Sequence, residues 1–395
     1  MNLKDKIERI SLEITGDIIA KRRYLHRNPE LSFEEFQTSK YVKTELEKLG
    51  ISFTSMAKTG VLAEIKGELA SDKVIALRAD MDALPITEIE GREYGSINKG
   101  VMHACGHDVH TASLLGVAQI LQSLKPEFGG VVKLIFQPGE ERPPGGAKIM
   151  IEEGVLENPK PQAVLGQHVM PELPKGKVGF RSGKYMASND ELFVRVMGRG
   201  GHGAQPQQNI DPVVITAQII TALQQVVSRI ANPTMPSVLS FGKVIANGAT
   251  NIIPDEVYLE GTFRTLDEQW RKEAHISMKK MAEGIANSLG GTCSFEIREG
   301  YPFLENEPKL TSEIRAYAEE FIGKEKVVDL DLWLASEDFA FYSQATNACF
   351  YRLGTGNESK GITSDLHTST FDIDESAIEL SIGLMAYITL RELGN

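Results

Sequence analysis

The segment GVMHACGHDVH, residues 100–110, concentrates side chains that can bind a metal ion. Three histidines, one cysteine and one aspartate fall within eight of its positions, although the whole chain of 395 residues has only eight histidines and three cysteines. Imidazole, thiolate and carboxylate ligands together favour a borderline divalent ion such as zinc, manganese, cobalt or nickel. The segment therefore predicts a metal site. Members of this cluster that bind no metal, for which His103, Asp108 and His110 are candidates, would support the loop, the helix start or the orientation of a ligand.

Further polar residues that can bind a metal follow the predicted strands. They are Asp80, Asp82, Glu140, Glu141, His168 and His367. In open α/β sheets, ligands bind outside the carboxyl ends of the strands, so we expect these side chains to converge there. The adjacent glutamates Glu140 and Glu141 can divide two tasks. One would bind the metal, and the other would take a proton from a metal-bound water that attacks an amide carbonyl.

Two of these signals have ordinary structural explanations as well. A single histidine such as His168 is more often a hydrogen-bonded core residue than a ligand, and a pair of glutamates is more often solvated surface. Glu140 and Glu141, however, follow an apolar strand and precede the sterically restricted loop RPPGGA. This context favours a functional position for the pair.

The first half of the chain alternates between patterns typical of strands and helices. Helical spacing of apolar residues predicts a first helix that Pro29 ends. Ser32 and Glu35 resemble a capping box for a second helix, which Gly50 closes. Strands are expected at 61–66, 73–79, 131–137 and 163–169, and a helix at 111–124. Such alternation predicts an α/β layer with a largely parallel sheet.

The middle of the chain follows a different order of elements. The patterns predict β-α-β-β-α-β, with strands at 191–197, 237–245, 257–264 and 292–299 and helices at 211–230 and 267–289. This order is typical of a ferredoxin-like split unit. We therefore predict that residues 187–298 form a domain inserted into another that comprises residues 1–186 and 299–395. A further buried strand is expected at 347–353.

The motif GRGGHG, residues 198–203, fits the glycine pattern of a dinucleotide-binding turn. Pro206 follows it, the next helix begins only near Asp211, and no acidic residue lies about twenty positions further on, as such a turn requires. The glycines more plausibly allow a loop to present His202 closely to a ligand.

Composition excludes several classes of partner. The net charge of −12 is unsuited to a general electrostatic grip on nucleic acid, although one local arginine could still bind a small anion. We found neither a signal-peptide core nor an apolar run near the length of a membrane helix, which predicts no membrane partner. Three widely spaced cysteines argue against a disulfide framework, so we expect a reducing cytoplasm.

Nine motifs in a fixed order resemble the family of N-acyl-amino-acid amidohydrolases. They are RADMDALPI, GVMHACGHDVH, FQPGEE followed by GGA and MIEEGVL, HVMPELPKGKVG, GRGGHGAQP, NIIPDEV, GTFR, SEDFA and LHTSTFD. The family includes hippurate hydrolases, bacterial aminoacylases, N-acetyldiaminopimelate deacetylases and indole-acetyl-amino-acid hydrolases. The resemblance covers nearly the whole chain, and it is specific for the family but not for the substrate.

The resemblance implies a fold and a set of site residues. The fold would be a zinc-peptidase-like α/β catalytic domain that carries an inserted domain, often used for dimerisation, which here would be a homodimer or a higher homo-oligomer. Two divalent metal ions would be bound by Cys105, His107, Glu141, His168 and His367. Glu140 would be the general base, Asp82 would orient a ligand histidine, and His202, Asn251 and Arg264 would bind the substrate.

The implied reaction is hydrolysis of an N-acyl-L-amino acid by a hydroxide held between the metals, with Glu140 moving the proton. A metal-dependent dipeptidase or carboxypeptidase of the same fold is the nearest alternative. A non-catalytic metabolite-binding protein is another, but binding alone does not require a base beside a ligand carboxylate. The chain departs from the family at Leu334-Ala335 and at Arg142-Pro143-Pro144. Both changes could reshape the substrate pocket, so neither the acyl group nor the amino acid follows from the resemblance.

Overall fold

The computed structural model describes residues 2–394, which divide into two units. Unit 1 comprises residues 2–185, 305–332 and 338–394, and unit 2 comprises Met186–Leu304 together with Trp333–Glu337. Each unit has its own cluster of buried apolar side chains. The short strands β7 (Gly183–Met186) and β14 (Leu304–Asn306) lie where the chain passes from one unit to the other.

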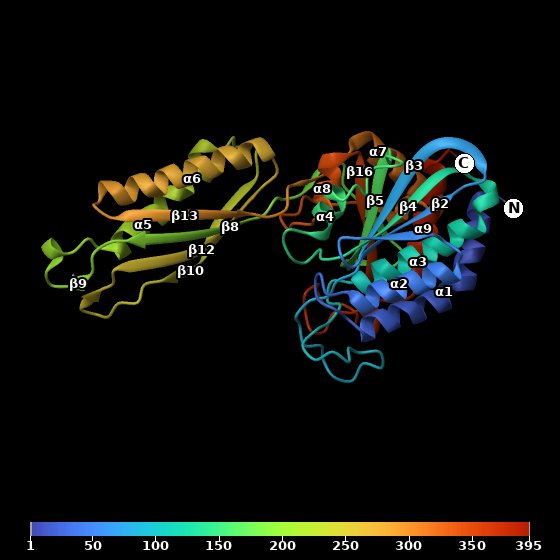
Figure 1. Ribbon diagram of the computed structural model, residues 1–395, viewed down its shortest axis with the longest axis horizontal. Coiled ribbons are helices and arrows are strands. Elements are labelled where there is room, and N and C mark those ends of the chain that lie inside the picture. Colours follow the sequence, from blue (N-terminus) through green and yellow to red (C-terminus); the bar gives the residue numbers. More distant parts are fainter. Residues whose placement is uncertain (1, 395) are drawn as a thin grey trace. The chain divides into compact units, whose positions relative to one another are not determined.

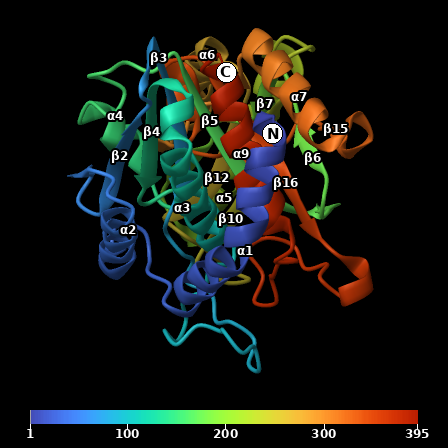
Figure 2. The ribbon, with the colours of Figure 1, turned by 90° about the vertical axis from the view of Figure 1, so that its right-hand side faces the viewer.

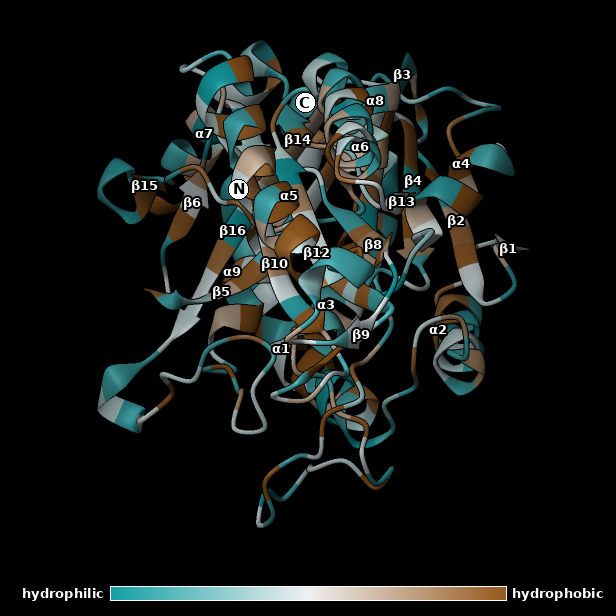
Figure 3. Ribbon diagram, turned by 90° about the vertical axis from the view of Figure 1, so that its left-hand side faces the viewer, coloured by the Kyte–Doolittle hydropathy of each residue, from teal (hydrophilic) through white to brown (hydrophobic). Residues whose placement is uncertain are grey.

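Unit 1 is built on a sheet of eight strands in the order β1-β2-β4-β3-β5-β16-β6-β15 (Figure 1). The strands are β1 (Phe53–Met56), β2 (Gly60–Lys66), β3 (Leu69–Asp80), β4 (Gly129–Gln137), β5 (Ala163–Pro174), β6 (Val178–Phe180), β15 (Val327–Asp329) and β16 (Ala348–Gly356). The four central strands β4, β3, β5 and β16 pair parallel with one another, and β15 pairs parallel with β6 at one edge. The β1-β2, β2-β4 and β16-β6 pairs are antiparallel. The expectation of a largely parallel sheet therefore holds for its centre and for the β6-β15 pair, but not for the other pairs. Apolar residues, brown in Figure 3, recur along the strands.

Helices cover both faces of this sheet. They are α1 (Leu3–Arg27), α2 (Phe36–Lys48), α3 (His107–Ser123), α4 (Gly146–Glu152), α7 (Pro308–Ile322), α8 (Ala340–Ala345) and α9 (Ala377–Glu392), with short 3-10 turns at Lys125–Glu127, Lys324–Lys326 and Glu358–Lys360. Figure 2 shows α1, α3 and α9 side by side. α3 is buried along nearly its whole length, because it lies between the sheet and these two helices. Its position fixes the segment that carries Cys105 and His107.

The start of α3 is anchored to α1 by buried charges. The guanidinium of Arg22 donates to Asp108 at 2.7 Å, and the Nδ1 atom of His26 lies 2.9 Å from the same carboxylate. Burial opposes ionisation of Asp108, but Arg22 and then His26 outweigh it and hold the pKa of that carboxyl well below its usual range. Asp108 therefore supports the helix start, as one of the sequence-based alternatives proposed.

The capping box expected at Ser32 and Glu35 is absent from the described chain. α2 begins at Phe36, and neither residue caps it through its side chain. Ser32 instead donates its hydroxyl to Asp82 at 2.6 Å, while Glu35 turns inward. Glu30 takes over the capping role and accepts the backbone N–H groups of Gln37 and Thr38. The prediction was wrong because tertiary partners compete with local capping for the same polar groups.

Unit 2 has the predicted β-α-β-β-α-β order. Its sheet runs β10-β12-β8-β13, from strands β8 (Asp190–Met197), β10 (Ser237–Ile245), β12 (Glu256–Thr265) and β13 (Thr292–Glu299). α5 (Pro212–Gln225), which continues as a π-helical turn at Val226–Ile230, and α6 (Glu268–Ser288) pack together and on the sheet (Figure 1). β9 (Gly201–His202) and β11 (Ile252–Ile253) form a separate antiparallel sheet of two strands. A 3-10 turn at Pro206–Gln208 follows β9 in the chain.

The sequence-based statement that no apolar run approaches the length of a membrane helix needs correction. The segment Pro212–Ile230 is long and apolar enough to cross a membrane by length and composition. Such a single helix is weak support for a span, because core helices pass the same test. Here Ile215, Ile219 and Leu223 of this segment pack into the apolar cluster of unit 2.

Candidate metal centre

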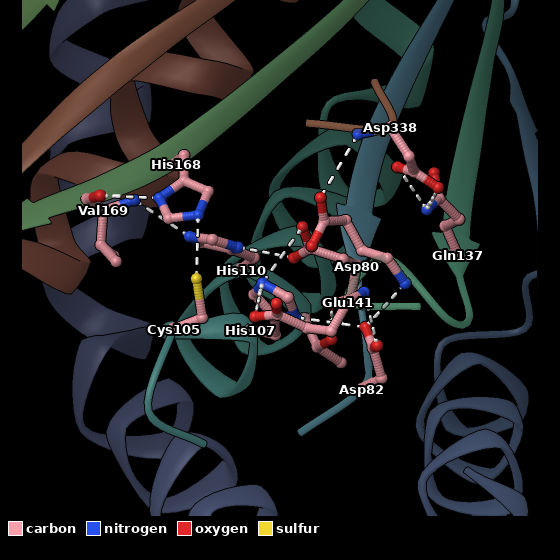
Figure 4. A network of polar contacts seen from close by, with 12 residues as sticks. Asp80, Asp82, Cys105, His107, His110, Gln137, Glu141, His168, Val169 and Asp338 are labelled. Carbon is pink, nitrogen blue, oxygen red and sulfur yellow. Dashed lines mark hydrogen bonds and ion pairs between the residues drawn. The ribbon is translucent and has the colours of Figure 1, made fainter. Parts of the chain in front are cut away.

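The predicted ligands of unit 1 meet at the carboxyl ends of its central strands (Figure 4). Asp82 follows β3, Glu140 and Glu141 follow β4, and His168 lies within β5. Cys105 and His107 come from the segment that enters α3, and His367 comes from the loop after β16. The structure thus brings together all seven residues that the sequence analysis assigned to metal and catalytic roles in this unit.

Among the described residues, five groups of three side chains could hold a metal ion, and two of these groups share Cys105. The first set is Cys105, His107 and His168, and the second is Cys105, Glu141 and His367. The Sγ atom of Cys105 lies 3.4 Å from Nε2 of His168 and 3.3 Å from Nε2 of His367. A thiolate placed between two sets of ligands can be shared by two metal ions.

The backbone of His367 is strained. Its φ angle of 61° places a non-glycine residue in the left-handed region, and its N–H donates to the carbonyl of Ala104 at 2.8 Å. Side chains rarely adopt this conformation unless their surroundings enforce it, and such residues cluster at functional sites. The strain turns the imidazole of His367 toward Cys105 and Glu141.

Hydrogen bonds set the protonation of the ligand histidines. In His168, Nδ1 lies 2.7 Å from the carbonyl of Val169, so this nitrogen carries the proton and Nε2 directs its lone pair toward Cys105. Burial, and after it the charge of Arg352, hold the pKa of His168 well below its usual value. His168 is therefore a neutral imidazole in the form that binds metals.

The surroundings of His107 favour positive charge. Burial alone would lower its pKa, but Asp80 and then Asp82 outweigh that effect and raise the pKa to about 10. Its Nδ1 atom lies 3.2 Å from Asp82, whereas the buried Nε2 atom has no hydrogen-bond partner, and neither has Oε1 of Glu141. Buried polar atoms are nearly always satisfied. Two orphaned ligand atoms 3.9 Å apart, in an anionic setting, fit a divalent cation well.

Asp80 also lies near His107, at 3.6 Å, but its oxygens already have other partners. Arg78 donates to one oxygen at 2.6 Å, and Nδ1 of His110 contacts the other at 2.6 Å. The Nε2 atom of His110 accepts the N–H of Val169 at 3.0 Å, so its lone pair is not free for a metal. Asp80 and His110 therefore support the end of β5, beside the candidate ligand His168.

Asp82 is a hub of four hydrogen bonds. Its carboxylate accepts the backbone N–H groups of Glu140 and Glu141, each at 3.0 Å, in addition to the Ser32 hydroxyl and His107. Burial opposes its ionisation, but the contact with His107 leads a set of donors that lower its pKa. One carboxylate thus orients a ligand imidazole and the loop that carries both glutamates.

The Oε1 atom of Glu140 accepts the backbone N–H of Asp338 at 3.3 Å, and the side chain is buried. The carboxylate of Asp338 is itself held by Arg78 at 2.7 Å and by Gln137 at 2.8 Å. Sequence analysis missed Arg78 and Gln137 and mentioned Asp338 only within the motif SEDFA. A charged arginine inside the apolar run KVIALRAD was the signal that could have revealed a buried anionic partner.

The three predicted substrate-binding residues all lie in unit 2, at two separate places. His202 and Asn251 are neighbours, because β9 pairs with β11 and the N–H of Gly203 donates to Asn251. Arg264 lies near the far end of β12 and is held by the hydroxyls of Thr262 and Ser336. Among the described residues, Arg264 forms no ion pair; burial lowers its pKa, and the charge of Asp190 opposes that effect only in part.

Comparison with known proteins places this geometry in context. The model of Peptidase family M20/M25/M40 matches residues 76–391. The chain is 39% identical over 394 residues to thermostable carboxypeptidase 2 of Saccharolobus solfataricus, a match that covers 99% of this chain and 98% of the relative. It is 43% identical over 299 residues to the N-acyl-L-amino acid amidohydrolase of Geobacillus stearothermophilus, covering 75% and 80% of the two chains.

A solved structure shares the fold. The YXEP protein of Bacillus subtilis, described as a dinuclear metal-binding peptidase of the M20 family, superposes with a TM-score of 0.83 at 35% identity, over 96% of this chain and 99% of that one. The expected zinc-peptidase-like catalytic fold is therefore confirmed, and a site for divalent metal ions is supported by the relatives as well as by the ligand sets.

Replacing Cys105 tests the shared position of its thiolate. We expect Cys105→Ala to weaken binding of at least one ion by about 10-fold or more, because even residues that only orient ligands contribute about 10- to 100-fold. Metal content after dialysis and a manganese titration of the metal-free protein measure the effect. Cys349→Ala is the matched control, because Cys349 is also buried but belongs to neither ligand set. Unchanged stoichiometry and affinity in Cys105→Ala would show that the thiol does not bind metal.

Proposed function

The chain belongs to Peptidase family M20/M25/M40 and is a hydrolase of amide bonds, and we propose that it cleaves N-acyl-L-amino acids into a carboxylic acid and a free amino acid. The observation that carries this proposal is the pair Glu140 and Glu141. One loop carries both carboxylates. Glu141 lies among the candidate metal ligands, and the buried carboxylate of Glu140 lies beside them. A base beside a metal site is what hydrolysis of an unactivated amide requires.

We propose that the site holds two divalent ions, of zinc, manganese, cobalt or nickel. Cys105, His107 and His168 would hold one, and Cys105, Glu141 and His367 the other. When bound, the ions would supply Lewis acidity, which lowers the pKa of water and polarises the substrate carbonyl. The mixture of sulfur, nitrogen and oxygen ligands suits these metals better than magnesium or calcium.

Glu140 would move the proton of the reaction. Its carboxylate takes a proton from the attacking water while a C–O bond forms to the acyl carbon. It then returns the proton to the amide nitrogen as the C–N bond breaks, so the products are a carboxylate and an amine. The N–H of Asp338 donates to one oxygen of Glu140 at 3.3 Å, a contact that would help to orient the carboxylate for this transfer.

The residues of unit 2 would recognise the two ends of the substrate. Arg264, which has no acidic partner within ion-pair distance in the described chain, would pair with the free carboxylate of the amino acid. His202 would donate to the oxyanion that forms at the acyl carbon. The Nδ1 atom of its ring accepts the N–H of Ala204 at 3.0 Å, so the neutral ring carries its proton on the exposed Nε2.

The positions of His202 and Arg264 within unit 2 support a dimeric enzyme. Met197, which comes shortly before His202 in the chain, pairs with Glu256 at the start of β12. Arg264 lies eight residues further along β12. At about 3.3 Å per residue, the two ends are roughly 26 Å apart, which exceeds the reach of one small N-acyl amino acid. We therefore propose that His202 and Asn251 act on the substrate held by a second copy of the chain.

Unit 2 has a surface suited to that second copy. β10 is an edge strand of its sheet, and edge strands offer unpaired backbone groups. Val244 and Ile245 on this strand are exposed, as are Val213 and Val214 on α5. No residue from Pro212 to Ser228 carries a charge. Pairing of β10 with its symmetry mate, with α5 alongside, would cover these apolar groups.

A carboxypeptidase is the second candidate, because the Saccharolobus relative bears that name. The two activities share their chemistry and differ in the group attached to the scissile carbonyl. Release of a C-terminal residue from longer blocked peptides would favour the carboxypeptidase. We also propose a cytoplasmic location, since none of the three cysteines forms a disulfide and Cys105 would have to stay reduced to bind metal.

The role of Glu140 is tested by Glu140→Gln. We expect the manganese-loaded wild type to release amino acids from N-acetyl or N-benzoyl substrates, and the variant to lose roughly 100- to 10,000-fold in kcat because no base remains. Metal content should stay near that of the wild type, as Glu140 is not required in either ligand set. A variant that keeps substantial turnover would exclude Glu140 as the base. A wild type that cleaves free-amine dipeptides better than their N-acetylated counterparts would favour a dipeptidase instead.

Mixed dimers test whether His202 acts across the interface. His202→Ala and Glu140→Gln are each expected to be nearly inactive as homodimers. A purified mixed dimer should recover about half the activity of the wild type, because one of its two sites combines an intact Glu140 with the partner's intact histidine. Absence of recovery in a dimer of confirmed composition would show that His202 serves its own chain.

A further inference from the structure

The loop Gly139–Glu141 directs three consecutive backbone N–H groups into the protein. Those of Glu140 and Glu141 donate to Asp82, as described above. The third, from Gly139, donates at 2.8 Å to Oε1 of Glu35, a side chain that none of the roles discussed so far includes. The carboxylates of Asp82 and Glu35 therefore accept all three backbone N–H groups of this loop, which carries the proposed base and a proposed metal ligand.

Glu35 is fully buried, with 0% of its surface exposed. Besides Gly139, its Oε1 atom accepts the N–H of Phe33 at 2.8 Å, and its Oε2 atom accepts the hydroxyl of Thr59 at 2.6 Å. The side chain thus joins three segments that are distant in sequence. None of these contacts is to a metal ligand.

The segment that carries Glu35 also fits the loop sterically. Gly139 has a φ angle of +59°, and a Cβ atom added to it would lie 2.5 Å from the ring of Phe33. Phe33 itself has a φ angle of 65°, which is unusual for a bulky residue. Ser32, one residue earlier, donates to Asp82. The strained backbone of Phe33 and the close approach of its ring to Gly139 indicate that the segment of Ser32 to Glu35 packs tightly against the loop.

We propose that Glu35 is a positioning residue that holds the Gly139–Glu141 loop, and with it Glu140 and Glu141, by accepting the N–H of Gly139. This inference rests on the proposed function for its catalytic consequence, but the contact itself can be tested without activity. A shift of about 1 Å in a catalytic group can lower the rate by about 100-fold, and we expect loss of the acceptor to have an effect of this size on kcat.

The role requires an acceptor rather than a charge. Burial, and then the charge of Asp82, raise the pKa of Glu35 to about 7, so the neutral acid is readily formed. A proton on Oε2 would point at the Thr59 hydroxyl, which can reverse and accept it. Oε1 would still accept both N–H groups. A glutamine amide has the same arrangement, with oxygen toward Gly139 and nitrogen toward Thr59.

The decisive comparison uses Glu35→Gln, Glu35→Met and the control Glu30→Met. Glu30 belongs to the same segment and accepts N–H groups of α2, but it makes no contact with the loop. Hydrogen–deuterium exchange of the peptide that spans residues 138–146 is measured first, in metal-free protein. We expect faster exchange in Glu35→Met, and exchange like that of the wild type in Glu35→Gln and Glu30→Met.

Kinetics and manganese titration follow on the same proteins. Glu35→Met should lose about 100-fold in kcat with little change in KM and should bind manganese more weakly through Glu141, whereas Glu35→Gln should stay within about threefold of the wild type. If Glu35→Gln is as impaired as Glu35→Met, charge rather than acceptance is required, and the proposal fails. It also fails if loop exchange is unchanged in Glu35→Met, or if Glu30→Met is equally impaired. A wild type without hydrolase activity would refute the proposed function, while the exchange data would still decide the role of Glu35.

Discussion

The burial of two aspartates, Asp80 and Asp82, at the carboxyl end of β3 is the constraint on which the rest of the site depends. A carboxylate removed from water costs several kcal/mol unless donors surround it. Asp80 is satisfied by Arg78 and His110, and Asp82 by Ser32, His107 and the loop after β4. Satisfying these two carboxylates therefore fixes the start of α3, the Gly139–Glu141 loop and the end of β5 together.

Much of this arrangement could be predicted from sequence. Ligand-type residues stood directly after apolar strands, so the convergence of Cys105, Glu141 and His168 followed from the topology of an open sheet. The β-α-β-β-α-β order was equally readable from hydrophobic periodicity. Which member of each polar cluster binds metal was not readable, because His107 and His110 differ only in their hydrogen-bond partners. Resemblance to a known family, rather than spacing, distinguished them.

The misses share one physical cause. Arg78, Asp338 and Glu35 form the hydrogen bonds cited here with partners 59 to 260 residues away, and local patterns carry no information about such pairs. Ser32 and Glu35 were assigned to a helix cap because that local use of their side chains is common. In the folded chain the Ser32 hydroxyl donates to Asp82 instead, and the Glu35 carboxylate accepts the N–H of Gly139. Local signals failed here because tertiary contacts at the site use the same atoms.

The central claim is that the thiolate of Cys105 is shared by two metal positions. Anomalous diffraction from crystals of the manganese-loaded protein, collected at the manganese edge, tests it most directly. The account predicts two peaks, one beside His107 and His168 and one beside Glu141 and His367, with the Sγ atom of Cys105 between them. A single peak, or a peak between Asp80 and His110, would contradict it.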